Sequence, residues 1–483
     1  MAESTHNGAA AFVSFVGGAA FGVSTGVIAG VLSEDRWNNI GDLSAFLSSS
    51  LLYGIVVGSL LNVIITDKIG RRVTLLVGAI IAAVFAVAMA FCHILWLMCM
   101  IRGFSGVGIG IITTLAPLYA TELASTKRRG LIVGFFQVFI TIGIFAGYCL
   151  NMAFHKVTDG WRYEFALTSL MPILLIVGFF FLPETDSWKA MRDAKKQNAD
   201  NRPSFGQRTR FKFHVLKHYP RSIFVGVALS ILYQMTGLNV VVYYTNSIFK
   251  EAGVDNLTLS LGLTMAIGVW NFICSLIPPF IVDKFGRRPF VIIGCVPMII
   301  GMILLALSYQ LTFQTRYVLA IVGMILFLGG FEFGLGPIYF IVINEMFPAE
   351  VRNLASASQN LIMWLCNIII VHIFQPASKG MTPQGFFYLL AGLSLVLLLI
   401  VIFVMKETKG IETVFVEGVR ESCRSSNAAV DSNELEQVSS PPPQQSPPES
   451  SPEAEQTAQS EEPDEGGKTN LVTSDVEPTE RAE

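Results

Sequence analysis

Charged residues are scarce in this chain. Asp, Glu, Lys and Arg together make up 14% of its 483 residues, whereas 52% are hydrophobic. A soluble protein of this length needs a much larger charged surface, so the composition excludes an ordinary soluble globular protein. A lipid bilayer is the partner that such a composition indicates.

Other sequence features that are absent exclude further classes of protein. The seven cysteines are scattered without a CxxC pair, so a disulfide framework is not expected. No Lys or Arg precedes the first apolar run, which is long enough to be a full span, and a cleavable signal peptide is therefore not expected. The sequence has no HExxH motif, nucleotide-binding fingerprint or catalytic constellation. We therefore expect no enzyme activity, no cofactor, no metal site and no nucleic-acid partner.

Long apolar runs are abundant instead. Runs of 18 or more residues recur twelve times, and each can cross the hydrocarbon core of a bilayer. They cover approximately residues 9–30, 44–66, 73–92, 95–118, 130–152, 163–182, 222–248, 258–282, 289–309, 316–343, 354–375 and 385–405. The sequence thus predicts an all-α membrane protein with twelve transmembrane helices.

Basic residues gather in the loops that follow spans 2, 4, 6 and 8. They are Lys68, Arg71 and Arg72; Lys127, Arg128 and Arg129; ten Lys or Arg within residues 183–221; and Lys284, Arg287 and Arg288. With twelve spans, all these loops fall on one side of the membrane. The positive-inside rule makes that side cytosolic and places both termini there, with the plasma membrane as the expected location.

The chain contains an internal duplication. Asp67-Lys-Ile-Gly-Arg-Arg72 recurs as Asp283-Lys-Phe-Gly-Arg-Arg288. Three further pairs are each separated by 223 positions, namely Glu122 and Glu345, Arg129 and Arg352, and Glu184 and Glu407. A repeat of six spans is the plan of the major facilitator fold, which binds substrate between its two halves near the membrane midplane.

The duplication defines the expected domains. Residues 1–182 form the first six-helix bundle, 183–221 a basic cytosolic linker, 222–405 the second bundle and 406–483 a cytosolic tail. From about residue 421 the tail is rich in Ser, Pro, Glu and Gln, with fifteen acidic residues against three basic ones. Such a segment buries too little apolar surface to order itself, so we expect it to be disordered, with unknown partners.

Glycines recur at four-residue spacing inside several spans. They are Gly22, Gly26 and Gly30; Gly54 and Gly58; Gly106 and Gly110; Gly143 and Gly147; and Gly330 and Gly334. Because small residues let helices approach closely in lipid, we interpret these glycines as packing surfaces.

Polar residues inside spans indicate a functional site, because lipid penalises them. The candidates are Gln137, Gln234, Asn239, Tyr243, Tyr244, Asn271, Glu332, Trp364 and Asn367. Amides both donate and accept hydrogen bonds, which suits neutral hydroxyl groups, and an aromatic ring suits the apolar face of a sugar. For any single amide, an ordinary interhelical hydrogen bond is the alternative.

Charged residues at the cytosolic ends of the spans form a second set. Each half has an Asp-x-x-Gly-Arg-Arg turn, a Glu followed seven residues later by Arg, and a Glu at the end of its sixth span. The set comprises Arg71, Glu122, Arg129, Glu184, Arg287, Glu345, Arg352 and Glu407. Partly buried pairs of this kind predict a latch that holds the cytosolic side shut, with topological anchoring as the alternative.

Over about residues 12–412 the chain resembles the sugar porter family of the major facilitator superfamily. The motifs that carry the resemblance are Phe21-Gly22-Val-Ser-Thr-Gly26, both Asp-x-x-Gly-Arg-Arg turns, Arg102-Gly103-x-x-Gly106, Pro117-x-Tyr119-x-x-Glu122, Trp161-Arg162, Gln234-Met-Thr-Gly237-Leu-Asn239 with Tyr243-Tyr244, Gly336-Pro337 and Glu407-Thr408-Lys409-Gly410.

The resemblance implies roles for the polar residues. Gln137, Gln234, Asn239 and Asn271 match positions that bind sugar hydroxyls, and Trp364 and Asn367 line the same cavity. Glu332 matches an acid that connects binding to gating, and Tyr243 and Tyr244 resemble an outer gate.

The sequence departs from the family pattern at this site. Tyr233 replaces the first of two glutamines, Phe340 replaces a tryptophan, and Tyr339 replaces a proline. Met363 stands where an asparagine is usual. These departures leave the sugar open between a hexose, which we expect, and a pentose or polyol.

By this resemblance, Ser24 occupies a position at which the proton-coupled members of the family have an Asp. A serine hydroxyl does not titrate near neutral pH, and Arg129 matches the basic partner of that absent acid. We therefore predict a facilitative sugar uniporter that works by alternating access. A proton-coupled sugar or polyol symporter and a non-transporting nutrient sensor are the alternatives.

Overall fold

The computed structural model describes residues 2–32, 42–125, 129–186, 188–189, 192–193, 216, 219–254, 256–311, 313–347 and 349–405. The chain divides into two units, Met1–Arg420 and Glu421–Glu483. The described residues all belong to the first unit. The predicted disordered tail and most of the linker therefore lie outside the described residues.

The described secondary structure is helical. The helices are α1 (Ala2–Val31), α2 (Asp42–Ile69), α3 (Arg71–Ala90), α4 (Leu95–Leu123), α5 (Arg129–Phe154), α6 (Gly160–Leu167), α7 (Leu170–Gly178), the 3-10 helix η2 (Phe179–Phe181), α10 (Pro220–Met235), α11 (Leu238–Glu251), α12 (Leu257–Leu276), α13 (Pro278–Phe285), α14 (Arg287–Ser308), α15 (Phe313–Phe333), α16 (Leu335–Glu345), α17 (Ala349–Met381) and α18 (Pro383–Val404).

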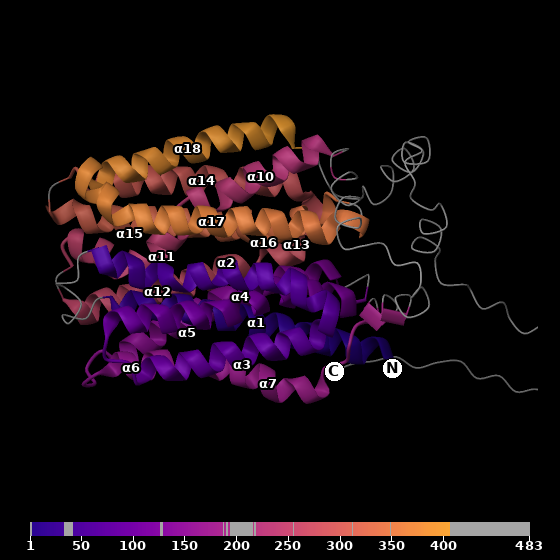
Figure 1. Cartoon of the computed structure of the whole chain (residues 1–483). Coiled ribbons are helices and arrows are strands. Elements are labelled where there is room, and N and C mark those ends of the chain that lie inside the picture. The colour runs from indigo at the N-terminus through magenta and orange to yellow at the C-terminus, as the bar shows by residue number, and fades with distance from the viewer. Residues whose placement is uncertain are drawn as a thin grey trace, which may run out of the picture. The chain divides into compact units, whose positions relative to one another are not determined.

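These helices make twelve segments that are long and apolar enough to cross a membrane, which confirms the predicted number of spans. They run lengthwise beside one another, and α1 begins at the same end of the bundle at which α18 ends (Figure 1). We call this the near end and the opposite end, where α1 ends at Val31, the far end. An even number of crossings explains why the chain returns to the near end.

Four spans are interrupted and consist of more than one helix. The breaks fall between α6 and α7, α10 and α11, α12 and α13, and α15 and α16. Gly237 separates α10 from α11 with φ 79°, a left-handed conformation that glycine adopts without a steric penalty. Pro278 and Pro279 begin α13 and lack the amide hydrogens that would continue α12.

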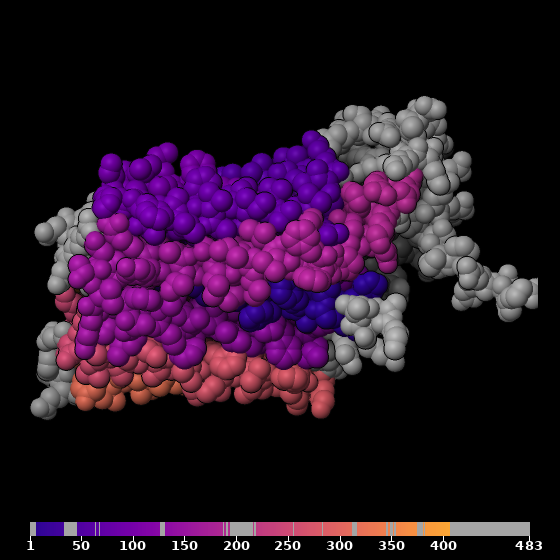
Figure 2. Space-filling model, turned by 90° about the horizontal axis from the view of Figure 1, so that it is seen from below, coloured from indigo at the N-terminus to yellow at the C-terminus, as the bar shows by residue number. Residues whose placement is uncertain are grey.

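The outer surface of the bundle is apolar, as a lipid-facing surface must be. On α3, Ile80, Val84 and Val87 are exposed along one helical face, whereas Ala79 and Ala82 are buried on the other. α1 is almost wholly covered by its neighbours, and in Figure 2 it reaches the surface only over a short indigo strip. The exposed apolar face of α3 therefore contacts acyl chains in a membrane.

Glycines allow the closest helix contacts. A Cβ added at Gly22 of α1 would lie 2.1 Å from the Ile140 carbonyl oxygen of α5, and one at Gly54 of α2 would lie 1.9 Å from the Gly103 carbonyl oxygen of α4. Gly294 and Gly334 bring α14 against the α15–α16 break in the same way. The structure thus confirms that these glycines form packing surfaces.

The duplicated turn has the same backbone in both halves. Gly70, which precedes α3, has φ 96° and ψ 165°, and Gly286, which precedes α14, has φ 88° and ψ 169°. A side chain with a Cβ is strained in this conformation, so glycine is required at both positions. The equal geometry supports the interpretation of the two motifs as copies of one element.

We expect Gly22→Ala to destabilise the protein. The added methyl group cannot fit beside the Ile140 carbonyl oxygen unless α1 and α5 separate, and overpacking of this kind costs about 1–3 kcal/mol. Thermal unfolding of the detergent-purified variant should show a lower midpoint. Gly392→Ala in α18 is the matched control, because nothing lies within 4 Å of a Cβ there. Equal midpoints for the two variants would contradict the packing role of Gly22.

Candidate substrate site between the halves

A cavity lies between helices of the first six spans and helices of the last six. In this conformation its free volume is about 40 Å³, room for a few water molecules. Its polar wall includes Gln137, Gln234, Asn239, Glu332 and Asn360. Its aromatic wall includes Phe21, Phe136, Tyr233, Phe340 and Trp364. A concave site with a few convergent polar groups suits a small molecule that has both hydroxyl groups and an apolar face.

The strongest polar contact across the cavity joins Gln137 of α5 to Glu332 of α15. The Gln137 Nε2 atom donates to both carboxylate oxygens of Glu332, at 3.2 and 3.1 Å. Both side chains are buried, at 3% and 1% exposure. Asn271 of α12 also approaches the Glu332 carboxylate, although it does not reach the cavity wall. A sugar hydroxyl that binds Gln137 must compete with this interhelical bond.

Gln234 and Asn239 lie on opposite sides of the break at Gly237. The Asn239 Nδ2 atom donates to Gln234 Oε1 at 3.1 Å. The left-handed turn at Gly237 interrupts the helix between them, and both side chains reach the cavity. The break therefore presents two amides to one site.

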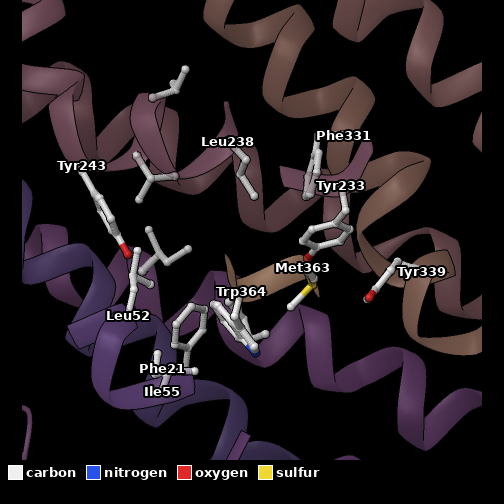
Figure 3. Packing of buried hydrophobic residues seen from close by; sticks show 14 of the residues in the cluster. Phe21, Leu52, Ile55, Tyr233, Leu238, Tyr243, Phe331, Tyr339, Met363 and Trp364 are labelled. Atoms are coloured by element: carbon white, nitrogen blue, oxygen red, sulfur yellow. The ribbon is translucent and has the colours of Figure 1, made fainter. Parts of the chain in front are cut away.

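The apolar part of the cavity is formed by rings from both halves. Phe21 of α1 packs edge-on against Trp364 of α17, with 5.3 Å between ring centroids. Figure 3 shows these two rings in contact, with Met363 close to Trp364. Asn367 lies one turn further along α17, where both polar atoms of its amide are buried without a hydrogen bond. The predicted lining role of Trp364 thus has a structural basis, whereas Asn367 does not reach the cavity.

The far end of the seam between the halves is held by hydrogen bonds. The hydroxyl groups of Ser48 on α2 and Tyr244 on α11 lie 3.0 Å apart. Tyr148 of α5 donates to the Val242 carbonyl oxygen at 3.2 Å, and Asn246 donates to the Ala29 carbonyl oxygen at 3.0 Å. Tyr243 is fully buried beside this seam. Both tyrosines thus lie at this far-end seam, and their role as an outer gate stays a prediction.

At the near end, part of the predicted charge set comes together around the start of α3. The Glu184 carboxylate accepts hydrogen bonds from the backbone N–H groups of Arg71 and Arg72, at 3.1 and 3.2 Å. The Arg71 Nη2 atom lies 3.2 Å from Glu122 Oε1 on α4. These contacts all lie within residues 71–184, so they brace the start of α3 rather than join the first half to the second.

Of the rest of the charge set, the described side chains include only Arg287. Arg287 is buried at the start of α14. The side chains of Arg129, Glu345 and Arg352 and the whole of Glu407 lie outside the described residues. The latch between the halves stays a prediction.

We expected Arg129 to be the arginine beside Ser24, but the structure places Arg102 there. The Arg102 Nη2 atom of α4 donates to the Ser24 backbone oxygen at 3.0 Å, and Arg102 is 1% exposed. Arg129 begins α5, whereas Gly26 of α1 packs against Ile144, fifteen residues along α5. The backbone of Arg129 therefore lies about 22 Å of helix from the level at which α5 crosses Gly26. Arg102-Gly103-x-x-Gly106, already visible in the sequence, was the signal for the correct residue.

The comparisons with known proteins agree with this architecture. Residues 10–417 match the family model described as "Sugar (and other) transporter". A galactose-proton symporter of Escherichia coli K12 is 27% identical, over 84% of this chain and 92% of the relative. A D-xylose-proton symporter of the same organism is 29% identical, over 76% and 85%.

A solved structure of a proton:xylose symporter of the major facilitator superfamily, bound to 6-bromo-6-deoxy-D-glucose, is similar in fold. It has a TM-score of 0.71 and 26% identity, and the alignment covers 86% of this chain and 99% of that chain. The chain therefore belongs to the sugar transporter family and is a multi-pass membrane transporter with the major facilitator fold, not an enzyme.

Proposed function

We propose that this protein carries a monosaccharide, most suitably a hexose, across the membrane by alternating access, as a facilitative uniporter. The cavity between the halves is the observation that carries the proposal. Its amides can exchange hydrogen bonds with hydroxyl groups, and its rings can cover the apolar face of a pyranose. Relatives described as galactose, arabinose and xylose symporters support a monosaccharide as substrate.

Alternating access requires two bodies that move about the site. We propose that residues 1–182 and 222–405 are these bodies. The far-end bonds between them are single hydrogen bonds, such as Ser48–Tyr244 and Asn246–Ala29, which can break and re-form during a cycle. The contacts within each half include glycine-mediated backbone packing, which cannot easily slide. This difference between the contacts that join the halves and the contacts within each half favours motion of one half relative to the other.

Uniport is supported by the surroundings of Ser24. Arg102 contacts the backbone oxygen of Ser24, and no ion pair involving Arg102 is found among the described residues. A proton-coupled site at this position would need a carboxylate to take up and release the proton. Glu332 is a buried carboxylate in the cavity wall. Because several relatives are described as proton symporters, coupling through Glu332 is the alternative.

The plasma membrane and cytosolic termini complete the proposal. Lys68, Arg72, Lys284 and Arg288 all lie at the near end, where α1 begins and α18 ends. The positive-inside rule places this end in the cytosol.

We expect Gln234→Ala to weaken sugar binding. Losing one buried hydrogen-bond partner costs about 1–3 kcal/mol, which raises KM by roughly 5- to 150-fold. Uptake of radiolabelled hexoses, pentoses and polyols into proteoliposomes would measure KM. Asn62→Ala is the matched control, because Asn62 is a buried amide that bonds Thr66 within α2, outside the cavity lining. An unchanged KM in the Gln234 variant would remove this residue from the site.

We expect transport to equilibrate sugar without proton movement. Sugar added to de-energised proteoliposomes should leave the internal pH unchanged, and a protonophore should not alter the final internal concentration. Sugar accumulation above the outside level that collapses with the proton gradient would instead establish symport. In that case Glu332→Gln should abolish accumulation while exchange continues, if Glu332 carries the proton.

We expect Glu184→Gln to lower the stability of the protein, because the Glu184 carboxylate braces the start of α3. The variant loses the negative charge at the N-terminus of α3, an interaction worth about 0.3–2 kcal/mol. Thermal unfolding of the detergent-purified variant should show a lower midpoint. Asp186→Asn is the control, because Asp186 is exposed and pairs with Lys189. Equal midpoints for the two variants would contradict this role of Glu184.

A further inference from the structure

A second, smaller space lies at the far end of the seam between the halves. Its free volume is about 20 Å³, room for one water molecule. The residues that line it are Gly30, Asn151, His155, Glu164, Leu257 and Leu261, and none of them lines the substrate cavity. The first half supplies the polar groups, and α12 of the second half supplies the two leucines that cover them.

A hydrogen bond from His155 crosses the seam beside this space. The His155 Nδ1 atom lies 2.7 Å from the Met152 carbonyl oxygen, and Nε2 lies 3.2 Å from Thr258 Oγ1 on α12. Because a carbonyl oxygen only accepts, Nδ1 carries a hydrogen, and in the neutral ring Nε2 accepts from the Thr258 hydroxyl. In the charged ring Nε2 donates to the same oxygen, and a charge-assisted bond is the stronger of the two.

The groups around His155 suit a positive charge. The Glu164 carboxylate is 2% exposed and lines the same space. The Asn151 Oδ1 atom is buried with no hydrogen-bond partner among the described residues, since Nδ2 of the same amide donates to the Gly26 carbonyl oxygen at 3.2 Å. Both groups offer oxygen acceptors, and an opposite charge nearby favours the charged form of an ionisable group.

The other described charges near the space do not compete for this role. Lys156, next to His155 in the chain, is exposed to solvent. Asp159 and Arg162, near the start of α6, pair with one another at 3.5 Å. The residues of α1 and α12 that line the space are uncharged. Glu164 is therefore the charged group that shares the space with His155.

We propose, on the basis of the proposed alternating access, that His155, Glu164 and Thr258 form a proton-binding clasp that holds the far end closed. When the halves separate at this end, Thr258 leaves His155, and water screens the ring from Glu164. The closed state thus binds the proton more tightly than the open state. A ligand populates the state that binds it better, so acid at the far side closes the far end.

The clasp regulates the carrier without coupling it to protons. His155 follows Phe154, the last residue of α5, at the far end of the bundle (Figure 1). Its proton therefore enters from the far-side solution and returns to it. No proton crosses the membrane by this route, so the clasp is compatible with uniport.

Spin labels on the two halves measure the opening of the far end directly. Val157 and Lys250 are exposed there, one on each half, and cysteines at these positions can be labelled after the seven native cysteines are replaced. Electron–electron distance measurements then give the ratio of open to closed protein. Acidification from about pH 8 to about pH 5.5, where histidine gains its charge, should lower this ratio by roughly 5-fold. A ratio that stays constant or rises overturns the proposal.

Two variants test whether the clasp causes the response. His155→Gln keeps a polar side chain that takes up no proton, and Thr258→Val removes the bond across the seam but keeps His155 and Glu164. Both should lose the response to pH. His93→Gln is the matched control, because His93 is an exposed far-end histidine that contacts Arg162 and should leave the response intact.

Either variant decides the proposal if the other does not fold. A response that persists in His155→Gln assigns the proton to another group, and one that persists in Thr258→Val places its effect within the first half. Each result overturns the clasp. Hexose exchange in proteoliposomes at equal pH on both sides tests the proposed function separately, because exchange without a response of the far end overturns the clasp alone.

Discussion

Inside a bilayer a polar side chain has no water to bond, so each one must find its partner within the protein. The contact between Gln137 and Glu332 is the clearest consequence of this constraint in the present structure. A buried carboxylate and a buried amide satisfy one another across the seam between the halves. A substrate that enters the cavity must offer hydroxyl groups in exchange, and this requirement links substrate binding to the contact between the halves.

The same constraint explains where the helices break. Backbone that leaves helical geometry within the membrane is tolerated where it lines a cavity or is buried by protein. Gly237 interrupts span 7 next to the site, and the break directs Gln234 and Asn239 into it. Gly334 interrupts span 10 two residues after Glu332, and its own contacts with Gly294 and Phe290 cover the break. The helix breaks therefore coincide with the positions of the polar groups at the site.

Lipid also provides no hydrophobic force to bring helices together. Gly22, Gly54 and Gly294 allow backbone contacts that side chains would prevent, and these contacts bind α1 to α5, α2 to α4 and α14 to α15. The two halves meet mainly through side chains, including Phe21 with Trp364 and Phe136 with Phe340. Side-chain contacts can separate and re-form more easily than interlocked backbones, which suits an interface that must open.

Hydropathy and repetition in the sequence determined the number of spans, the duplication, the glycine packing surfaces and the family, because each depends on the types and spacing of residues along the chain. Gln137, Gln234, Asn239 and Trp364 could also be predicted to meet. Only the tertiary structure decided that Arg102 contacts the Ser24 backbone oxygen, because that depends on how α4 packs against α1. It also decided that Tyr233, Tyr339 and Phe340, three separate departures from the family pattern, form one aromatic wall. Such contacts join residues that are about a hundred positions apart. Their geometry depends on how whole helices pack against one another, and the spacing of residues within one span does not define that packing.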